Sequence, residues 1–164
     1  MSLDPGVLYR DHATAVWRYA RARVPTDADA EDVTSDVFTR ALRTVEGYDP
    51  ASGMPRAWLV GIARHAVADF WRRRRPEDPT ASVPDRAGIS SDDPVEAVER
   101  AATTEDVHRL LDGLRERERE VVALRFGAEL SSAEIGDALG ISPTAARMLL
   151  HRAVTKLRGV MTDE

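Results

Sequence analysis

Apolar side chains recur at intervals of three or four residues along most of this chain, with charged residues between them. Proline, glycine or small polar residues interrupt the pattern between successive stretches. The expected fold class is therefore all-α. The pattern predicts helices over Val7–Arg23, Ala28–Val45, Trp58–Arg75, a stretch that resumes near Val95, Glu116–Phe126, and Ser131–Arg158, the last interrupted by a turn.

The second and third of these helices have one apolar side each, which predicts their buried positions. In the second helix they are Val33, Val37, Phe38, Ala41, Leu42 and Val45. In the third they are Trp58, Leu59, Ile62, Ala66 and Phe70. The other side of the second helix carries Asp32, Ser35, Asp36, Thr39 and Arg43. A solvated charged surface is the ordinary explanation for such a side.

The last stretch has the pattern of a helix-turn-helix. Ser131 and Glu134 form a capping-box pattern, and Gly140 can end the first helix in the left-handed conformation. Ser142-Pro143 is a favourable start for the second helix, which carries Arg147, Arg152, Lys156 and Arg158 and no acidic residue up to that point. A basic second helix after a glycine turn is typical of proteins that read the DNA major groove. Helical hairpins that bind no nucleic acid are also common, so the motif alone leaves both readings open.

A second basic segment lies in the third predicted helix. Six arginines and one aspartate occur from Arg56 to Arg75, interleaved with aromatic residues. Such a combination can hold a phosphate backbone and stack exposed bases. The alternative is a helix end with arginines placed favourably for its dipole and ordinary core aromatics.

Charge divides the chain into unequal parts. The net charge is −5, but residues 1–75 sum to +2, residues 76–106 to −7 and residues 107–164 to 0. The acidic middle is rich in Pro, Ser and Asp, which predicts an extended linker. We expect two small helical domains, at 1–76 and 95–164, joined by a flexible acidic linker at 77–94.

Composition excludes several classes of protein. Cysteine is absent, which excludes disulfides and thiolate sites, and the four histidines lie far apart without metal-ligand spacing. No glycine-rich phosphate loop or assigned nucleophile is present, so we expect neither enzyme activity, nor a cofactor, nor a bound metal. There is no leader pattern and no apolar run of transmembrane length, which predicts a cytoplasmic protein without membrane insertion. Only GVMTDE follows Arg158, so we expect no appended regulatory domain.

Four segments together resemble the extracytoplasmic-function (ECF) sigma factors of bacterial RNA polymerase. DAEDVTSDVFTRA (Asp29–Ala41) and WLVGIARHAVADFWRRRR (Trp58–Arg75) are similar to the family's first conserved domain, sigma region 2. LLDGLRERERE-VVALRF (Leu110–Phe126) and SSAEIGDALGIS…HRAVTKLR (131–158) are similar to its last, sigma region 4. Nearly the whole chain is covered, and both blocks occur in the family's order.

The resemblance implies three binding surfaces. Binding to core RNA polymerase, through its clamp helices, would use Asp32, Ser35, Asp36, Thr39 and Arg43, while the last domain would meet the polymerase flap. The −10 element would be opened and held by Arg56, Trp58, Arg64, His65, Asp69, Arg72 and Arg73, together with the Gly47–Pro55 loop. The −35 element would be read by Ser142, Thr144, Arg147, Met148, His151 and Arg152. The acidic linker would run through the RNA-exit path.

The chain departs from the family pattern at several positions. Ser35 replaces the usual Gln, His65 the usual Asn, and Leu114-Arg115 the usual Leu-Pro. In the recognition helix Ala145 stands where Thr is common, and Met148-Leu149 where small polar and Arg residues are common. Recognition of the −35 element would then depend on Arg147, His151 and Arg152, or Leu149 would pack inward or against a partner.

Three functions remain to be compared. The first is a sigma factor that directs core polymerase to promoters and melts them. The second is a sigma-like interaction module that binds core polymerase or an anti-sigma protein without opening promoters. The third, a free-standing helix-turn-helix repressor, gives the first half of the chain no role. The sequence leaves open whether regulation is by an anti-sigma protein, by abundance or by degradation.

Overall fold

The computed structural model describes residues 3–49, 51, 54–74, 109 and 111–162, and all regular elements in these residues are helical. This confirms the all-α fold class. The predicted linker and the helix expected near Val95 lie outside the described residues. The elements are α1 (Pro5–Arg23), α2 (Asp27–Thr44), η1 (Val45–Gly47), α3 (Pro55–Arg74), α6 (Glu116–Val122), η3 (Ala123–Gly127), α7 (Ser132–Leu139) and α8 (Pro143–Thr162).

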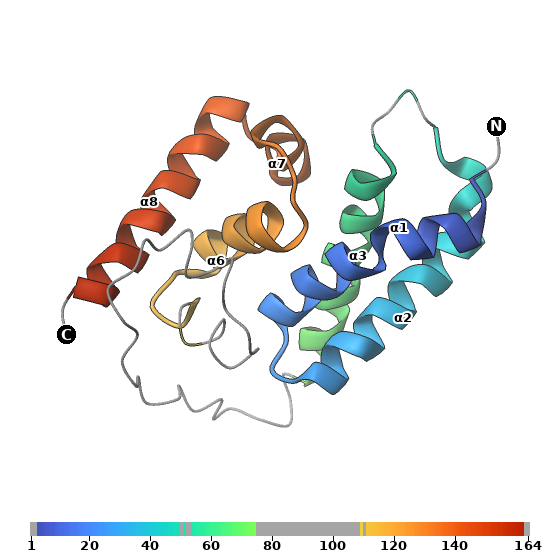
Figure 1. The fold of residues 1–164 in the computed structure, drawn as a ribbon, viewed down its shortest axis with the longest axis horizontal. Coiled ribbons are helices and arrows are strands. Elements are labelled where there is room, and N and C mark those ends of the chain that lie inside the picture. Colours follow the sequence, from blue (N-terminus) through green and yellow to red (C-terminus); the bar gives the residue numbers. More distant parts are fainter. Residues whose placement is uncertain (1–2, 50, 52–53, 75–108, 110, 163–164) are drawn as a thin grey trace.

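Helices α1, α2 and α3 form the N-terminal unit (Figure 1). Asp4 caps α1 through the amides of residues 6 and 7, and Thr26 caps α2 through the amide of Asp29. The turn between α1 and α2 is held by Arg21, a buried side chain. Its guanidinium donates to Asp27 Oδ1 at 2.7 Å and to the Val24 carbonyl at 3.0 Å. Local capping and one buried arginine thus set the α1–α2 connection.

The core of this unit is close to the predicted one, although Val45, Trp58, Ile62 and Phe70 are half-buried rather than buried, and one prediction is wrong. Val33, Val37 and Ala41 are buried as predicted, but Leu42 is 55% exposed. Leu42 adjoins an apolar pocket of about 90 Å³ beside Tyr9 and Phe38. The period of α2 carries residue 42 to the edge of the contact with α1, where none of the described helices covers it. The prediction that Leu42 is buried is therefore wrong.

Helices α6, α7 and α8 form the C-terminal unit, with η3 as a π-helical turn after α6 (Figure 1). The capping box is confirmed: Glu134 N donates to Ser131 Oγ at 3.1 Å, and Ser131 N donates to Glu134 Oε1 at 3.0 Å. Gly140 ends α7 with φ 69°, in the left-handed conformation that glycine adopts without a Cβ clash. Ser142 Oγ accepts from the amide of Ala145 at the start of α8. The predicted helix-turn-helix is present.

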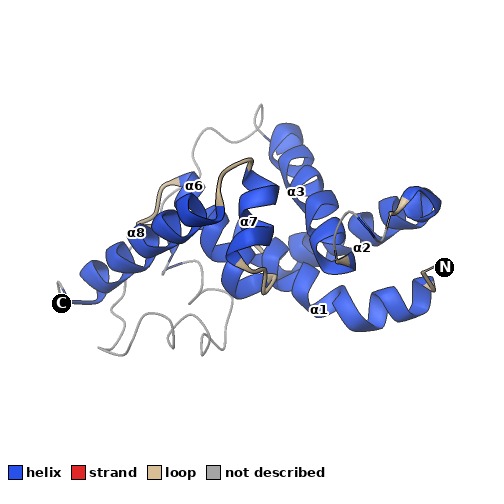
Figure 2. Cartoon of the chain, turned by 90° about the horizontal axis from the view of Figure 1, so that it is seen from above, coloured by secondary structure: helices blue, strands red, loops and turns tan. Residues whose placement is uncertain are grey.

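The two units are packed against each other, which the sequence pattern does not predict. The junction is formed mainly by η3 against α1, with smaller contacts of α6 with α1 and of α7 with α3. Figure 2 shows α7 beside α3. A Cβ on Gly127 would lie 3.0 Å from Tyr19 N and 3.1 Å from Tyr19 Cα, so a larger residue here would press against the α1 backbone. Buried apolar residues of both units form one continuous cluster.

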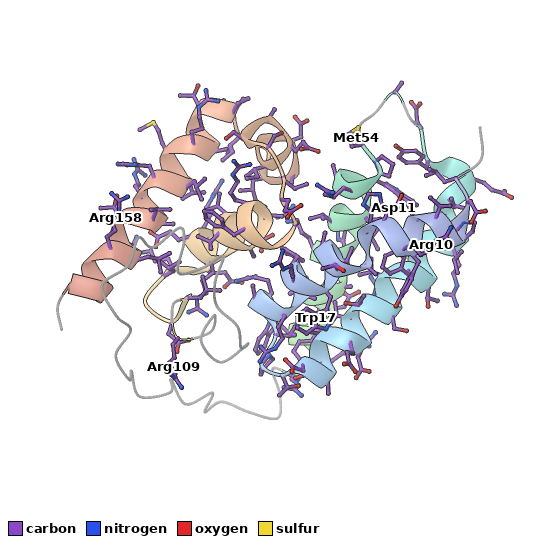
Figure 3. All side chains as sticks on the ribbon, viewed as in Figure 1. Arg10, Asp11, Trp17, Met54, Arg109 and Arg158 are labelled. Carbon is purple, nitrogen blue, oxygen red and sulfur yellow. The ribbon has the colours of Figure 1, made fainter. Side chains whose placement is uncertain are left out.

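Among the described helices, none combines the length and the hydropathy that a membrane span requires. The described residues also include no group of three or more His, Asp or Glu side chains placed to hold a metal ion. Figure 3 shows the side chains of the described residues. Met54, just before α3, and Arg158, near the end of α8, lie on opposite sides of the molecule.

Candidate nucleic-acid interface

The residues predicted to read the −35 element share one exposed side of α8. They are Ser142, Thr144, Arg147, Met148, His151 and Arg152, and each is exposed. Arg147 Nη2 donates to Thr144 Oγ1 at 3.3 Å, which aligns the guanidinium along the first two turns of the helix. Three basic or titratable side chains and two hydroxyls therefore face solvent together, as contact with a DNA backbone and base edges requires.

The two apolar residues in the middle of α8 have different surroundings. Leu149 is half-buried and packs against the core, whereas Met148 is 54% exposed among the polar residues. Packing by Leu149 answers one question left by the sequence. Met148 presents apolar surface where the −35 contacts are expected, and an apolar side chain in the major groove can contact the methyl group of thymine.

The residues predicted to bind core polymerase lie on the outer side of α2. Asp32, Ser35, Thr39 and Arg43 are exposed, and Asp36 is half-buried. Asp36 Oδ2 pairs with Arg40 Nη2 at 2.9 Å, one helical turn away. The side is thus mostly solvated, with one acid already engaged within the helix.

Arg40 also connects α2 to α3 through Asp69. Arg40 Nη2 lies 2.8 Å from Asp69 Oδ2, and Arg72 Nη2 lies 3.0 Å from Asp69 Oδ1. The hydrogen bond from Arg40 lowers the pKa of Asp69; burial opposes the shift in part, and the charge of Arg72 adds to the lowering. Asp69 is therefore an ionised acceptor that positions two arginines, one on each helix.

The predicted −10 residues on α3 divide between two sides of the helix. His65, Arg72 and Arg73 are exposed to solvent. Trp58 is half-buried, packs against the core and contacts the Tyr48 ring at a centroid distance of 5.1 Å.

The remaining two residues of the −10 set, Arg56 and Arg64, face the C-terminal unit. Arg56 Nη1 lies 3.6 Å from Glu129 Oε2, and Arg64 Nε lies 2.8 Å from Glu120 Oε1. The predicted −10 residues thus all lie on α3, but they do not form one continuous exposed surface.

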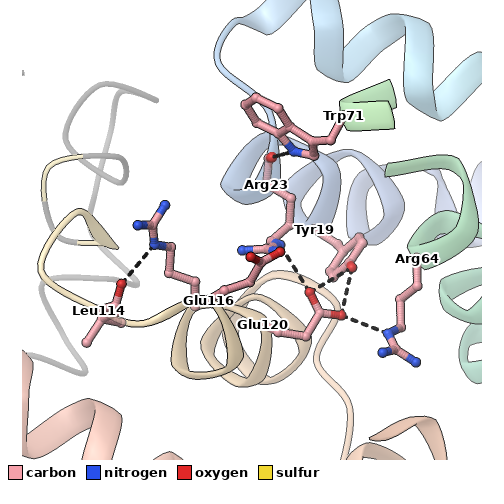
Figure 4. Close-up of polar contacts among 8 residues, drawn as sticks. Tyr19, Arg23, Arg64, Trp71, Leu114, Glu116 and Glu120 are labelled. Atoms are coloured by element: carbon pink, nitrogen blue, oxygen red, sulfur yellow. Dashed lines mark hydrogen bonds and ion pairs between the residues drawn. The ribbon is translucent and has the colours of Figure 1, made fainter. Parts of the chain in front are cut away.

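Glu120 is the centre of a polar network between the units (Figure 4). Its carboxylate accepts hydrogen bonds from Tyr19 Oη at 2.8 and 3.0 Å and pairs with Arg23 Nε at 3.0 Å as well as with Arg64. The Glu120 side chain is only 11% exposed. Burial raises the pKa of Tyr19 well above its usual range, and the neighbouring Glu120 carboxylate adds to the rise.

The sequence did not indicate this network. An Arg/Glu alternation such as that of Glu116–Phe126 usually forms pairs one turn apart, but Glu118 and Glu120 pair with other parts of the chain. Glu118 binds Lys156 Nζ of α8 at 2.6 Å, and Glu120 binds the N-terminal unit. In the sequence, the neighbouring apolar residues Val121 and Val122 hint that these two glutamates are buried, but they do not indicate which residues pair with them.

A cleft of about 640 Å³ opens beside Glu120, between the units. Arg64 and Arg72 line one wall and Glu116 the other, with the Trp71 ring on the N-terminal side. The Trp71 indole donates to the Arg23 carbonyl at 2.8 Å, which fixes the ring at this edge. The cleft combines arginine and aromatic groups, the two kinds of group that bind single-stranded nucleic acid.

Comparison with protein families matches both halves of the chain. Residues 8–77 match sigma-70 region 2, and residues 110–159 match sigma-70 region 4. The first range covers most of α1 and all of α2 and α3, and the second covers α6, α7 and most of α8. The surfaces described above therefore lie within the two matched regions.

Individual proteins give the same result. The ECF RNA polymerase sigma factor BldN of Streptomyces coelicolor is 35% identical over 164 residues; the match covers 97% of this chain and 61% of BldN. The ECF sigma factor ShbA of Streptomyces griseus is 34% identical, with 87% of this chain and 80% of ShbA covered. Sigma factor RpoE of Bartonella quintana, solved with the anti-sigma factor NepR, shares the fold with a TM-score of 0.71 at 17% identity, covering 97% of this chain and 98% of RpoE. The matched regions and these relatives show that the chain belongs to the ECF RNA polymerase sigma factors.

Proposed function

We propose that this chain binds core RNA polymerase and directs it to a class of promoters, with α8 at the −35 element and α3 at the −10 element. The observation that carries the proposal is the exposed polar side of α8, where Arg147, His151 and Arg152 point to solvent in a unit that matches sigma region 4. The protein would act in the cytoplasm and without a catalytic residue of its own. The domain limits at 1–76 and 95–164 are part of the same proposal.

At the −35 element the start of α8 would enter the major groove. The hydroxyls of Ser142 and Thr144 at the start of the helix suit phosphate contacts, while Arg147 would reach base edges. Met148 adds an apolar contact. The Met-Leu pair thus contributes one residue to the surface and one to the core, which supports a reading in which α8 still faces DNA.

At the −10 element the exposed side of α3 would hold the non-template strand. Arg72 and Arg73 would contact phosphates, and His65 lies two turns earlier on the same side as Arg72. Melting requires that a base leave the stack, at a cost of a few kcal/mol that protein contacts must return. The loop before α3, which carries the exposed Met54, directly precedes these residues in the chain and would contribute to holding the unstacked base.

The outer side of α2 would bind the polymerase. Asp32, Ser35, Asp36, Thr39 and Arg43 form a ridge along this helix, separate from the DNA-facing residues of α3. Separate surfaces allow polymerase and DNA to be bound together. A charge reversal at Asp32 and Asp36 should reduce co-purification with core polymerase while helical content is retained.

A second function is favoured by one observation. Arg56 and Arg64, two of the predicted −10 residues, are paired with acids of the C-terminal unit. A chain that kept this arrangement would bind core polymerase, or an anti-sigma protein as RpoE of Bartonella quintana does, without opening promoters.

Run-off transcription with purified core polymerase on a mixed genomic template distinguishes the two functions. New start sites that depend on the protein and share upstream motifs would support the sigma factor. Core binding without new starts would support the interaction module. If the protein neither binds core polymerase nor produces new starts, both functions are contradicted.

A further inference from the structure

We propose that Met148 restricts the −35 element of this chain to sequences with a 5-methylpyrimidine at one fixed base pair. In unmodified DNA this base is thymine. A side chain without a strong hydrogen-bonding group would thus select the base by its methyl group. The inference rests on the proposed function, because it names the feature of DNA that the same side of α8 recognises.

Met148 lies at the centre of the exposed side of α8. Buried Ala146 and Ala153 mark the opposite side, which packs on the core. Thr144 lies one turn before Met148 and Arg152 one turn after it, and both are exposed. Met148 is therefore placed between a hydroxyl and a guanidinium that are expected to face DNA, and not at the border of this surface.

The Met148 side chain is left largely uncovered by the described part of the chain. Helix α8 packs against α6 and α7 and lies on the far side of the C-terminal unit from α1, α2 and α3 (Figure 1). Within residues 143–159, Met148 is the one large apolar side chain that is exposed, at 54%. Its neighbour Leu149 is half-buried and packs against the core. The apolar surface of Met148 is thus available to a partner that approaches this side.

The residues around Met148 favour duplex DNA as that partner. From Pro143 to Thr162, α8 carries basic side chains and no acidic one. Arg147 Nη2 lies 3.3 Å from Thr144 Oγ1, so this guanidinium extends along the helix beside Met148. A positively charged surface of this kind attracts the phosphate backbone. The same approach would bring Met148 to the base edges in the major groove.

The thioether of Met148 suits one feature of the major groove. Methionine has no hydrogen-bond donor and its sulfur is a weak acceptor, so it cannot match the amino and carbonyl groups that distinguish most bases. The methyl group on C5 of thymine is the apolar group that the major groove presents. Burial of one group of this size corresponds to about a fourfold gain in affinity. Met148 would therefore favour thymine over cytosine at the pair that it contacts.

The first experiment changes only the methyl group of the DNA. A promoter found by run-off transcription is synthesised as duplexes in which each −35 thymine is replaced in turn by deoxyuridine, which lacks the C5 methyl group. At one position the complex of the chain with core polymerase should bind about fourfold more weakly. At that position 5-methylcytosine should bind about fourfold more tightly than cytosine. A shared −35 motif without a fixed thymine on either strand, or equal affinities for all the duplexes, would overturn the proposal.

The second experiment assigns the methyl contact to Met148. Met148→Leu keeps an apolar side chain and should keep the deoxyuridine effect, whereas Met148→Ser should remove it. Leu42→Ala is the control, because Leu42 is 55% exposed on α2, almost as exposed as Met148 on α8. This variant should show the same deoxyuridine effect as the wild type. An undiminished effect in Met148→Ser would overturn the proposal, since another residue would then contact the methyl group.

The transcription result separates failure of the inference from failure of the proposed function. If the chain and core polymerase produce no new starts, the proposed function fails and the inference fails with it. If starts with a shared motif appear, but neither deoxyuridine nor Met148→Ser changes binding, the sigma-factor function stands. Only the methyl contact is then overturned.

Discussion

At the scale of single residues, Asp69 shows how a predicted DNA-binding residue can have a structural task. It accepts from Arg40 of α2 and pairs with Arg72 of its own helix. Arg72 is 73% exposed, so Asp69 restrains an arginine that remains available to a phosphate. The resemblance to the family indicated the position of Asp69, and the structure adds the arginines that it positions.

Asp69→Asn should change the dependence of stability on pH. The hydrogen bond from Arg40 lowers the pKa of Asp69 in the folded state, so the unfolded chain takes up this proton more readily. The stabilisation is present above the ordinary carboxyl pKa of about 3.9 and is lost as pH falls through the lower folded-state value. Denaturant unfolding at several pH values should show Asp69→Asn less stable near neutrality and equal to wild type in acid. Asp32→Asn, on exposed α2 surface, is the control; a deficit of Asp69→Asn that is constant with pH would contradict the assignment.

Arg72→Ala with Arg73→Ala should weaken promoter opening and reduce its salt dependence. Each lost phosphate contact lowers the slope of log affinity against log salt by about one unit. Arg74→Ala is a matched control, since Arg74 is committed to Asp29 at 3.3 Å and lies over the Phe70 ring. Titration of open-complex formation against salt measures the slopes. An unchanged slope in the double variant would assign these arginines a structural role.

At the scale of elements, the helix-turn-helix depends on a close approach inside its turn. A Cβ on Gly136 would lie 2.6 Å from the Ile141 carbonyl oxygen, a backbone atom that cannot move away. This contact fixes the angle between α7 and α8, and through it the direction in which the exposed side of α8 faces. Gly136 serves packing, whereas Gly140 serves the left-handed backbone conformation.

Gly136→Ala should therefore destabilise the chain by about 1–3 kcal/mol, the usual range for overpacking. Gly159→Ala, in the same helical unit, places a Cβ where no atom lies within 4 Å. It should leave stability unchanged or raise it by up to about 1 kcal/mol through better helix propensity. Urea unfolding of both variants measures the difference. Equal midpoints would show that the turn adapts without cost.

At the scale of the whole molecule, the packed units share one apolar cluster and one buried charge network. The family match describes two regions, and nothing in either region alone indicates that they touch. The junction includes Arg56 and Arg64, two of the residues expected at the −10 element, and pairs them with Glu129 and Glu120 of the C-terminal unit.

Gly127→Val should separate the units without changing charge, because the added side chain would meet the Tyr19 backbone. Small-angle scattering should give a larger radius of gyration than for wild type, and thermal unfolding should become broader as the shared cluster divides. Gly159→Val provides the control for the β-branched side chain in a helix. If Gly127→Val keeps the dimensions of wild type, the junction does not depend on this approach.

Much of the local structure could be predicted from the sequence. The cap at Ser131, the end of α7 at Gly140 and the exposed side of α8 all follow from interactions between residues close together in the chain. Capping preferences and helical period act over a few residues, so the sequence expresses them directly. These features were sufficient to determine the all-α fold class and to indicate a DNA-reading helix.

Only the tertiary structure decided what happens between the units. Tyr19 and Glu120 are 101 residues apart, and no local pattern distinguishes a buried partner of this kind from a solvated acid. Leu42 was misplaced for the same reason, since burial depends on whether another helix covers a position and not on its place in the period. The sequence by itself determined which side chains each helix presents. The three-dimensional packing determined that Arg56 and Arg64 face acids across the junction, because that depends on the distance between surfaces from separate parts of the chain.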